Sequence, residues 1–328
     1  MYIMASSNEM NAGLARTGFR DLMTYFSTGA DPKSAGPVRH SVEENMLYFV
    51  GAGSYTTNAG KHPGVLGEAK DSMIYAAIGG RANSPENSGL LDLYPAGDAP
   101  VLVGYPYMSK AMIGYLQETP FKNWVLDSGA FTAAKGGKPI EIEKYIEDRR
   151  GYMKMKHPPK TIFALDVIGD PDASIRNTER MWADGVEAVP CFHYREPVRY
   201  LDHLAKSYPR IAFGGLVGVR PKERVAWGSS CLRRIWPKRV HGFGVTDRQT
   251  RMACPFDTVD SSSWVMGPRA FGRSSKFPGV KFPTGKANSP AVRQLIAAEV
   301  LSLLKIDLAA ERKWTKQLAE VRGSGWPA

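Results

Sequence analysis

Two aspartates, Asp257 and Asp260, stand three positions apart in the stretch CPFDTVDSSSW, residues 254–264. Side chains alternate between faces along an extended strand, so these two carboxylates cannot point the same way. Paired carboxylates without a metal motif suggest substitution at a sugar carbon, in which one carboxylate attacks and another transfers the proton. The serines at 261–263 can orient a carboxylate, bind a phosphate or simply form a turn. The first question is which of the two aspartates takes part in the reaction.

Further aspartates follow other short apolar runs of the chain. Asp127 follows NWVL, and Asp166 follows TIFAL. A single Asp after a strand is often a helix cap or a turn residue, but three of them at strand ends indicate a site. Asp260 lies nearer the end of its run, whereas Asp257 lies deeper, where an unpaired inward charge is costly to desolvate. We therefore predict that Asp260 takes part in the reaction and that Asp257 has a structural role.

The apolar runs themselves are typical of strands that are buried on both faces, as in parallel sheets. Eight of them occur, and amphipathic helical segments separate most of them: residues 46–54, 99–107, 123–131, 161–169, 187–194, 210–218, 239–246 and 254–262. Eight strand–helix steps favour an α/β fold of the (β/α)8 TIM-barrel type over an open doubly wound sheet. In such barrels, the site lies at the C-terminal ends of the strands.

The remaining segments surround this predicted barrel. We predict an N-terminal extension at residues 1–42 with one helix near Leu14–Phe26, followed by a barrel domain at 43–328. The segment Gly53–Asp98 is too long for an ordinary connection and predicts an insertion after strand 1. Ser289 and Pro290 are typical of a helix start, so C-terminal helices are expected to close the barrel.

Composition excludes several classes of protein. The 328 residues are 43% hydrophobic, with no apolar run long enough to cross a membrane and no signal-peptide pattern, which predicts a cytoplasmic protein (host cytoplasm if phage-encoded). Three scattered cysteines fit neither a disulfide framework nor a paired metal spacing, so neither metal nor cofactor is expected.

The net charge of +11 suggests a polyanionic partner. Between Ser261 and Ala298 there are six cations and no acid, which favours nucleic acid.

Five motifs occur in an order that resembles the tRNA-guanine transglycosylases. They are LDSGAF (126–131), ALDVIG (164–169), FGGLVG (213–218), HGFGVT (241–246) and VDSSSW (259–264). Within that superfamily, the chain is most similar to the phage and bacterial DpdA-type enzymes, which place 7-deazaguanines in DNA. The resemblance covers roughly residues 45–275 and implies base exchange without hydrolysis.

The resemblance also implies roles for individual residues. Asp260 corresponds to the nucleophile that attacks C1′, Asp127 to the general acid/base, and Asp166 to the acceptor for the N1–H and 2-amino edge of the base. Gly215 N–H is expected to contact O6, and the Leu216 carbonyl to contact the substituent at position 7. The predicted substrate site is completed by Ser128 and Gly214, by His193, and by Phe131 and His241, which match the positions that sandwich the purine ring.

Some residues depart from the family pattern. Ala130 replaces the second glycine of DSGGF, and His193 stands where bacterial tRNA enzymes have a glutamine. His193 either replaces the hydrogen bond of that glutamine to O6 or is a packed histidine. The bacterial tRNA form of the nucleophile motif favours Asp257, whereas the longer archaeal match agrees with Asp260. No Cys or His follows Cys254, so the zinc element of the tRNA enzymes is missing.

The leading hypothesis is a pentosyltransferase, a DNA-guanine transglycosylase. Its partners are expected to be DNA and a free 7-deazaguanine base such as 7-cyano-7-deazaguanine, and no membrane. Arg269, Arg273 and Lys276, just past the nucleophile, are the predicted contacts to flanking phosphates. The alternatives are a tRNA-guanine transglycosylase of the queuine or archaeosine type, a non-catalytic nucleic-acid-binding barrel, and, more weakly, a glycoside hydrolase.

Overall fold

The structure is a computed structural model of the whole chain. It describes residues 2–4, 24–27, 47–49, 74–78, 100–118, 123–136, 138–262, 273–274 and 277–281, together with the single positions 299, 302, 306, 309, 310, 313 and 314. The chain divides into two compact units. One comprises residues 1–70, 83–98 and 265–299, and the other comprises residues 71–82, 99–264 and 300–328.

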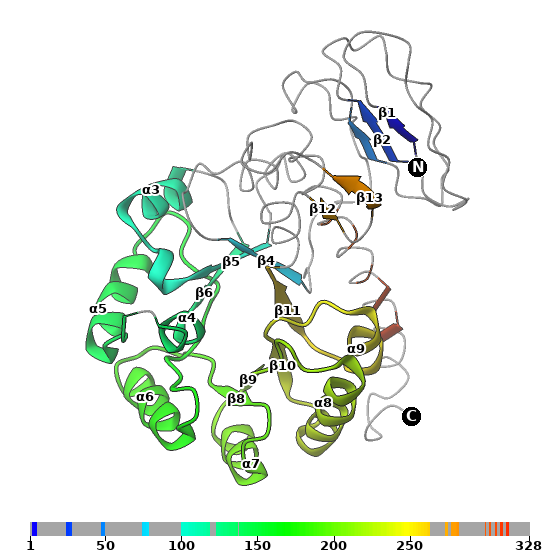
Figure 1. The fold of residues 1–328 in the computed structure, drawn as a ribbon. Helices are drawn as coiled ribbons and strands as arrows, with labels where there is room; N and C mark the ends of the chain where they lie inside the picture. The colour runs from blue at the N-terminus through cyan, green and yellow to red at the C-terminus, as the bar shows by residue number, and fades with distance from the viewer. Residues whose placement is uncertain are drawn as a thin grey trace. The chain divides into compact units, whose positions relative to one another are not determined.

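The second unit is built on a sheet of eight parallel strands, which Figure 1 shows as a ring with helices outside it. In chain order, the strands are β4 (Ile74–Ile78), β5 (Pro100–Gly104), β6 (Asn123–Asp127), β7 (Thr161–Ile162), β8 (Cys191–His193), β9 (Arg210–Gly214), β10 (Arg239–Gly242) and β11 (Thr258–Ser261). Consecutive strands pair with each other except β7 and β8, which lie at the two ends of the strand order, and β11 pairs with β4.

The ring closes between β7 and β8. Phe163, just past β7, forms a parallel bridge with Val189, just before β8. The Ala164 N–H donates to the Val189 carbonyl at 2.9 Å, and the Val189 N–H donates to the Ile162 carbonyl at 2.8 Å. The predicted α/β fold of the (β/α)8 barrel type is therefore confirmed.

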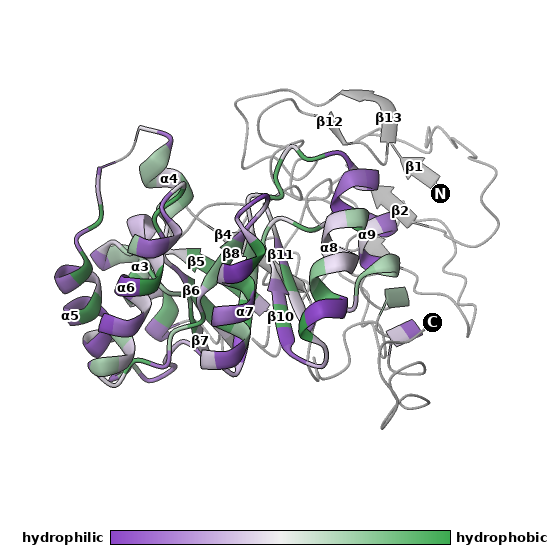
Figure 2. Cartoon of the chain, turned by 90° about the horizontal axis from the view of Figure 1, so that it is seen from below, coloured by the Kyte–Doolittle hydropathy of each residue, from purple (hydrophilic) through white to green (hydrophobic). Residues whose placement is uncertain are grey.

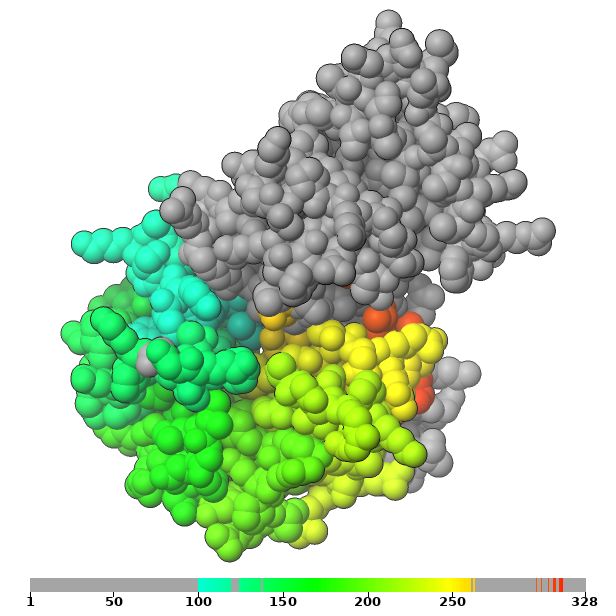
Figure 3. Space-filling view, in the orientation of Figure 1, coloured from blue at the N-terminus to red at the C-terminus, as the bar shows by residue number. Residues whose placement is uncertain are grey.

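Helices lie between most of the barrel strands, as the sequence predicts. They are α3 (Lys110–Glu118), the short α4 (Ala130–Ala134), α5 (Ile142–Tyr152), α6 (Pro171–Ala183), α7 (Val198–Ser207), α8 (Pro221–Ile235) and α9 (Arg248–Ala253). Asp170 caps α6 by accepting from the Ala173 N–H, with Pro171 in the first turn. Figure 2 shows hydrophilic and hydrophobic residues mixed on α5 to α8. In Figure 3, the colours of the second unit run from cyan through green to yellow around the molecule, in the order of the chain.

The first strand of the barrel differs from the prediction. We expected it within residues 46–54, but β3 (Leu47–Phe49) belongs to a separate parallel sheet with β1 (Tyr2–Met4) and β2 (Thr24–Ser27). The first barrel strand is β4, which lies inside the predicted insertion Gly53–Asp98. Both runs are short and apolar, so only long-range pairing distinguishes them. The insertion that follows the first barrel strand is therefore shorter than predicted.

Other predictions concern the ends of the chain. Residues 24–26 of the predicted N-terminal helix lie in β2, so that end of the helix is wrong, and the rest of it lies outside the described residues. The boundary between residues 42 and 43 also lies outside them and stays a prediction. The described positions from 299 to 314 are helical, as predicted. Trp314 donates its indole N–H to the Arg251 carbonyl at 3.0 Å, which attaches the C-terminal helix to α9.

The inward face of the strands changes from apolar to polar along the barrel. One apolar cluster inside the ring contains Leu102, Phe163 and Val189 together with Val125, Cys191 and Ala212. Two positions further along their strands, and hence on the same face, come Gly104, Asp127, His193 and Gly214. The barrel thus has an apolar interior and a polar C-terminal end.

The opposite end of the barrel is held by charge pairs. Asp257 directly precedes β11, and its carboxylate lies 3.0 Å from the guanidinium groups of both Arg210 and Arg239, which begin β9 and β10. A charge pair at this end contributes to stability, because the N-terminal end of a TIM barrel is remote from its chemistry. Asp257 therefore has the structural position that the sequence predicted.

We expect Asp257→Asn to lower the free energy of unfolding by roughly 1 to 3 kcal/mol, because a charged acceptor shared by two arginines is lost. Urea denaturation measures the change. Asp202→Asn is the matched control: it breaks an exposed ion pair with Arg234 and should cost less than about 1 kcal/mol. Equal losses in the two variants would contradict a stabilising role for Asp257.

Candidate active site

Three carboxylates come together at the C-terminal end of the barrel. Asp127 ends β6, Asp166 follows β7, and Asp260 lies in β11. Burial, and then the nearby charges of Asp166 and Asp260, raise the pKa of Asp127 to about 7. Charges act in this way only over short distances, so the three predicted aspartates share one site.

The turn after Asp127 has a steric requirement. Gly129 has φ +77°, and a Cβ on it would lie 2.1 Å from Cδ of Pro106. Only glycine fits at this position, because other residues strain at this φ and would also collide. In this turn, the Gly129 N–H donates to Oδ2 of Asp127 at 3.2 Å. The DSG motif therefore orients Asp127 through its backbone.

Asp166 is held by two donors, one on each oxygen. Ser128 donates its hydroxyl to Oδ1 at 2.8 Å, and Nε2 of His193 lies 2.8 Å from Oδ2. The other ring nitrogen of His193 lies 3.1 Å from Oε1 of Glu196, whose second oxygen accepts from the His193 backbone N–H at 2.9 Å. His193 is thus fixed between two carboxylates.

These contacts define the protonation of His193. Burial alone lowers its pKa, but the facing groups Cys191, Asp166 and Glu196 outweigh burial and raise the pKa above its ordinary value. Ionised carboxylates only accept hydrogen bonds, so both ring nitrogens must donate. His193 is therefore an imidazolium at neutral pH and has no N–H left for another partner.

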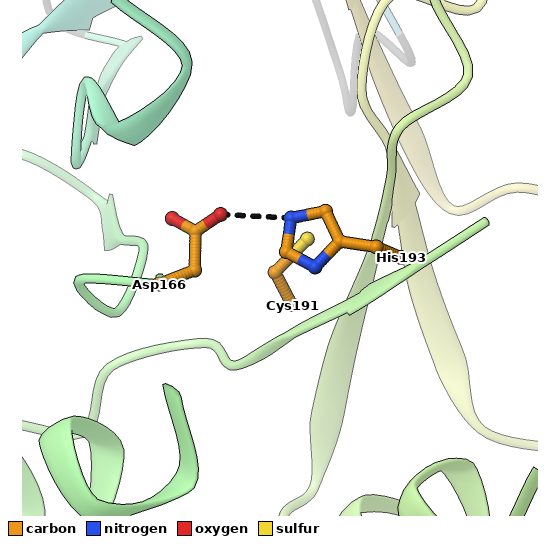
Figure 4. A group of neighbouring side chains, drawn as sticks. All are labelled: Asp166, Cys191 and His193. Atoms are coloured by element: carbon orange, nitrogen blue, oxygen red, sulfur yellow. Dashed lines mark hydrogen bonds and ion pairs between the residues drawn. The ribbon is translucent and has the colours of Figure 1, made fainter. Parts of the chain in front are cut away.

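Asp166, Cys191 and His193 also form the one group of metal-ligating residue types found among the described residues, with ligand atoms within 4.8 Å of one another (Figure 4). Metals bind the thiolate of cysteine and the neutral ring of histidine. Here burial raises the pKa of the Cys191 thiol to about 11, and His193 is charged. The arrangement therefore fits a hydrogen-bonded cluster, and a metal ion would have to displace protons from two of its members.

The glycine turn after β9 packs against His193. A Cβ on Gly214 would lie 2.7 Å from both Sγ of Cys191 and Cδ2 of His193. Gly215 follows with φ +70° and is exposed, whereas Leu216 is buried. The structure thus places Gly214 and Gly215 beside His193, and the contacts of all three residues to a substrate stay predictions.

Asp260 is held from the neighbouring strand. Its Oδ1 accepts from the Gly244 N–H at 2.8 Å and lies 3.6 Å from Nε2 of His241. Gly244 has φ +66°, a conformation that favours glycine. Because Asp260 lies near the C-terminal end of β11 and Asp257 lies before its start, only Asp260 is placed among the other acids.

His241 does not lie where the sequence predicted. We expected it to stack on a purine ring, but it has no exposed surface, and its ring centroid lies 4.6 Å from those of both Phe163 and Phe243. It precedes the C-terminal end of β10 and points into the filled interior. The stacking role of His241 is therefore wrong. Phe131 is about half exposed beneath Nζ of Lys135, and its stacking role stays a prediction.

The predicted phosphate contacts cannot be placed. Arg269 and Lys276 lie outside the described residues, and Arg273 begins β12 (Arg273–Ser274), which pairs with β13 (Phe277–Lys281) in the first unit. Their contacts to nucleic acid stay predictions.

Sequence reasoning missed several residues of this site. Glu196 lies three positions after His193, a spacing that could have suggested an acid–histidine pair. Gly244 gave no local signal, because its contact with Asp260 joins segments that are distant in the sequence.

No known protein family matches the sequence, and no curated protein matches it either. Among solved structures, the chain is similar to a chain of the tryptophan synthase complex from the hyperthermophile Pyrococcus furiosus, with 11% identity over 72% of this chain and 98% of that one, and a TM-score of 0.45. It is also similar to the carboxyl transferase domain of Rhizobium etli pyruvate carboxylase, with 12% identity over 77% of this chain and 54% of that one, and a TM-score of 0.39. Likeness at this level says nothing about what this chain binds or converts.

Within the described parts of the chain, no helix has the length and apolar character needed to span a membrane.

We expect the stability of the protein to fall as pH rises between about 4 and 7, because folding raises the pKa of Asp127 from 3.8 to about 7. The folded state then binds a proton that the unfolded state has released. Asp127→Asn removes this dependence, so the variant should gain stability relative to the wild type, by up to roughly 4 kcal/mol at pH 8 at 1.36 kcal/mol for each pH unit. Urea denaturation at several pH values tests this, and parallel curves for the two proteins would refute it.

We expect Gly214→Ala to destabilise the fold by about 1 to 3 kcal/mol, because the added methyl group overlaps Cys191 and His193. Gly114→Ala is the control: it lies inside α3 with no atom within 4 Å of its Cβ, so it should stabilise by about 0.5 to 1 kcal/mol. Thermal or chemical denaturation measures both, and a neutral Gly214→Ala would show that the ring of His193 has room to move.

Proposed function

We propose that this chain is a DNA-guanine transglycosylase, which exchanges guanine in DNA for a 7-deazaguanine derivative through a covalent glycosyl-aspartate intermediate. The observation that carries the proposal is that Asp127, Asp166 and Asp260 lie at the C-terminal ends of three strands of one barrel. Three carboxylates with three different environments support three different roles.

In the first half-reaction, Asp260 attacks C1′ of a deoxyguanosine nucleotide. A bond forms between a carboxylate oxygen and C1′, the C1′–N9 bond breaks, and its electron pair leaves with guanine. Asp127 gives the departing base a proton. A pKa of about 7 supports this role, because both protonation states of Asp127 are then populated near neutral pH.

The second half-reaction reverses these steps with another base. The incoming 7-deazaguanine loses its N9 proton to Asp127 and attacks C1′, and the ester to Asp260 breaks. Both carboxyl groups return to their starting states, so atoms and protons balance over the cycle. Water is not consumed, which distinguishes exchange from hydrolysis by a glycosidase.

Asp166 is the proposed reader of the base. An ionised carboxylate only accepts, so it suits the N1–H and 2-amino donors of guanine. Ser128 and the His193 imidazolium orient it, while the second lone pair on each oxygen stays available for the base. Because both ring nitrogens of His193 face carboxylates, we assign His193 to orienting Asp166 and not to O6. Gly215 N–H and the Leu216 carbonyl are the proposed contacts to O6 and to the substituent at position 7.

The proposed macromolecular substrate is DNA. Reaching C1′ requires extrusion of the nucleotide or a single strand. Phe131 is the proposed stacking partner of the base, and Arg269, Arg273 and Lys276 are the proposed contacts to flanking phosphates. The charge of +11 supports a polyanionic partner of this kind.

The test incubates the protein with radiolabelled guanine and either DNA or tRNA. We expect label in DNA, and we expect Asp260→Asn to reduce incorporation by at least about 1,000-fold because it removes the nucleophile. Asp202→Asn, an exposed carboxylate change on α7, should incorporate label as the wild type does. Label in tRNA alone would establish the RNA-directed alternative, and no label in either nucleic acid would refute the proposal.

A further inference from the structure

A chain of polar groups connects the charged end of the barrel with the underside of Asp260. Arg210 donates to Oγ1 of Thr258 at 2.5 Å, and Oγ1 of Thr258 lies 2.8 Å from Nδ1 of His241. The other ring nitrogen of His241 lies 3.6 Å from Oδ1 of Asp260. Thr258 and Asp260 are two positions apart on β11, so both point inward, and His241 pairs with Thr258 in the strand register.

The chemistry of these groups determines where the ring proton lies. An arginine guanidinium can only donate, so Oγ1 of Thr258 accepts from Arg210, and its own proton is available for Nδ1 of His241. The nitrogen on the other side of the ring, Nε2, faces a carboxylate oxygen of Asp260, which is an acceptor. A neutral imidazole carries one proton, and placing it on Nε2 suits both neighbours, with Nδ1 accepting from Thr258. The opposite tautomer would place a lone pair against a carboxylate oxygen.

We propose that His241 is a positioning residue for Asp260, and that Arg210 and Thr258 set its tautomer so that the Nε2–H group faces Oδ1. The catalytic meaning of this arrangement rests on the proposed function, in which Asp260 is the nucleophile. Oδ1 then faces two donors, the N–H groups of Gly244 and His241, and Oδ2 is the oxygen directed to C1′.

A neutral donor suits this position. Burial lowers the pKa of His241, against the opposing charge of Asp260, so the ring stays neutral at neutral pH. An imidazolium would form a tight ion pair with Asp260 and stabilise the ground state of the nucleophile. A neutral N–H group orients the carboxylate and leaves its negative charge available for attack.

The first experiment measures the tautomer directly and needs no activity. The protein is labelled with ¹⁵N in the rings of its six histidines, and His241→Gln assigns the signal of His241. We expect NMR at neutral pH to show the proton of His241 on Nε2. A proton on Nδ1, or on both nitrogens, would overturn the inference.

The second experiment connects the tautomer to the reaction. Thr258→Val keeps the shape of the side chain but removes its hydroxyl, so we expect the ring proton to distribute over both nitrogens. The rate at which denaturation-resistant protein–DNA adduct forms in a single turnover should fall about 10- to 100-fold, the cost of a misplaced reacting group, with KM for the incoming base unchanged. Thr258→Ser restores the hydroxyl and should restore both the tautomer and the rate to near the wild type.

Thr161→Val is the matched control. It removes another hydroxyl that accepts from Arg210, at 3.2 Å, without touching His241, so tautomer and adduct rate should stay as in the wild type. If wild-type protein forms no adduct, the proposed function fails while the tautomer measurement still decides this inference. If wild-type protein forms adduct and Thr258→Val forms it equally fast, the positioning role of His241 is refuted.

Discussion

The site depends on placing three carboxylates close together in a largely buried layer. Like charges in such surroundings cannot all persist without compensation. Asp166 is balanced by the imidazolium of His193, and Asp260 is stabilised by the Gly244 N–H. Among the described residues, Asp127 has only backbone donors, and its carboxyl group keeps a proton up to about pH 7. The repulsion between the three carboxylates therefore gives them different environments, which suit the proposed roles of acceptor for Asp166, nucleophile for Asp260 and acid for Asp127.

Backbone geometry makes this crowding possible. Gly129 follows Asp127 where a side chain would collide with Pro106, and Gly214 lies against the ring of His193. Gly244 turns its N–H towards Asp260 at a positive φ. At all three positions, a glycine permits a polar contact that a Cβ would obstruct or strain. The glycines of the strand-end turns therefore allow the polar contacts that hold the charged side chains, in addition to shaping the turns.

The two ends of the barrel use charge for different purposes. At the N-terminal end, Asp257 pairs with Arg210 and Arg239, and the charges cancel within hydrogen-bond distance. At the C-terminal end, the acids outnumber their cationic partners among the described residues. Thr258 and His241 lie between these ends, and hydrogen bonds connect Arg210 through Thr258 to the ring of His241, which faces Asp260. The stabilising Asp257, which directly precedes β11, and the proposed nucleophile Asp260 therefore lie near opposite ends of the same strand.

The sequence alone determined most of the barrel and the identity of its acids, because buried strands followed by amphipathic helices leave a local periodic pattern. It also separated Asp260 from Asp257, since position along a strand can be read directly. Only the tertiary structure decided that β4 and not residues 46–54 begins the ring, that His241 is buried, and that His193 lies between two carboxylates. Each of these depends on which strands become neighbours, and pairing between segments far apart in the chain leaves no trace in local composition.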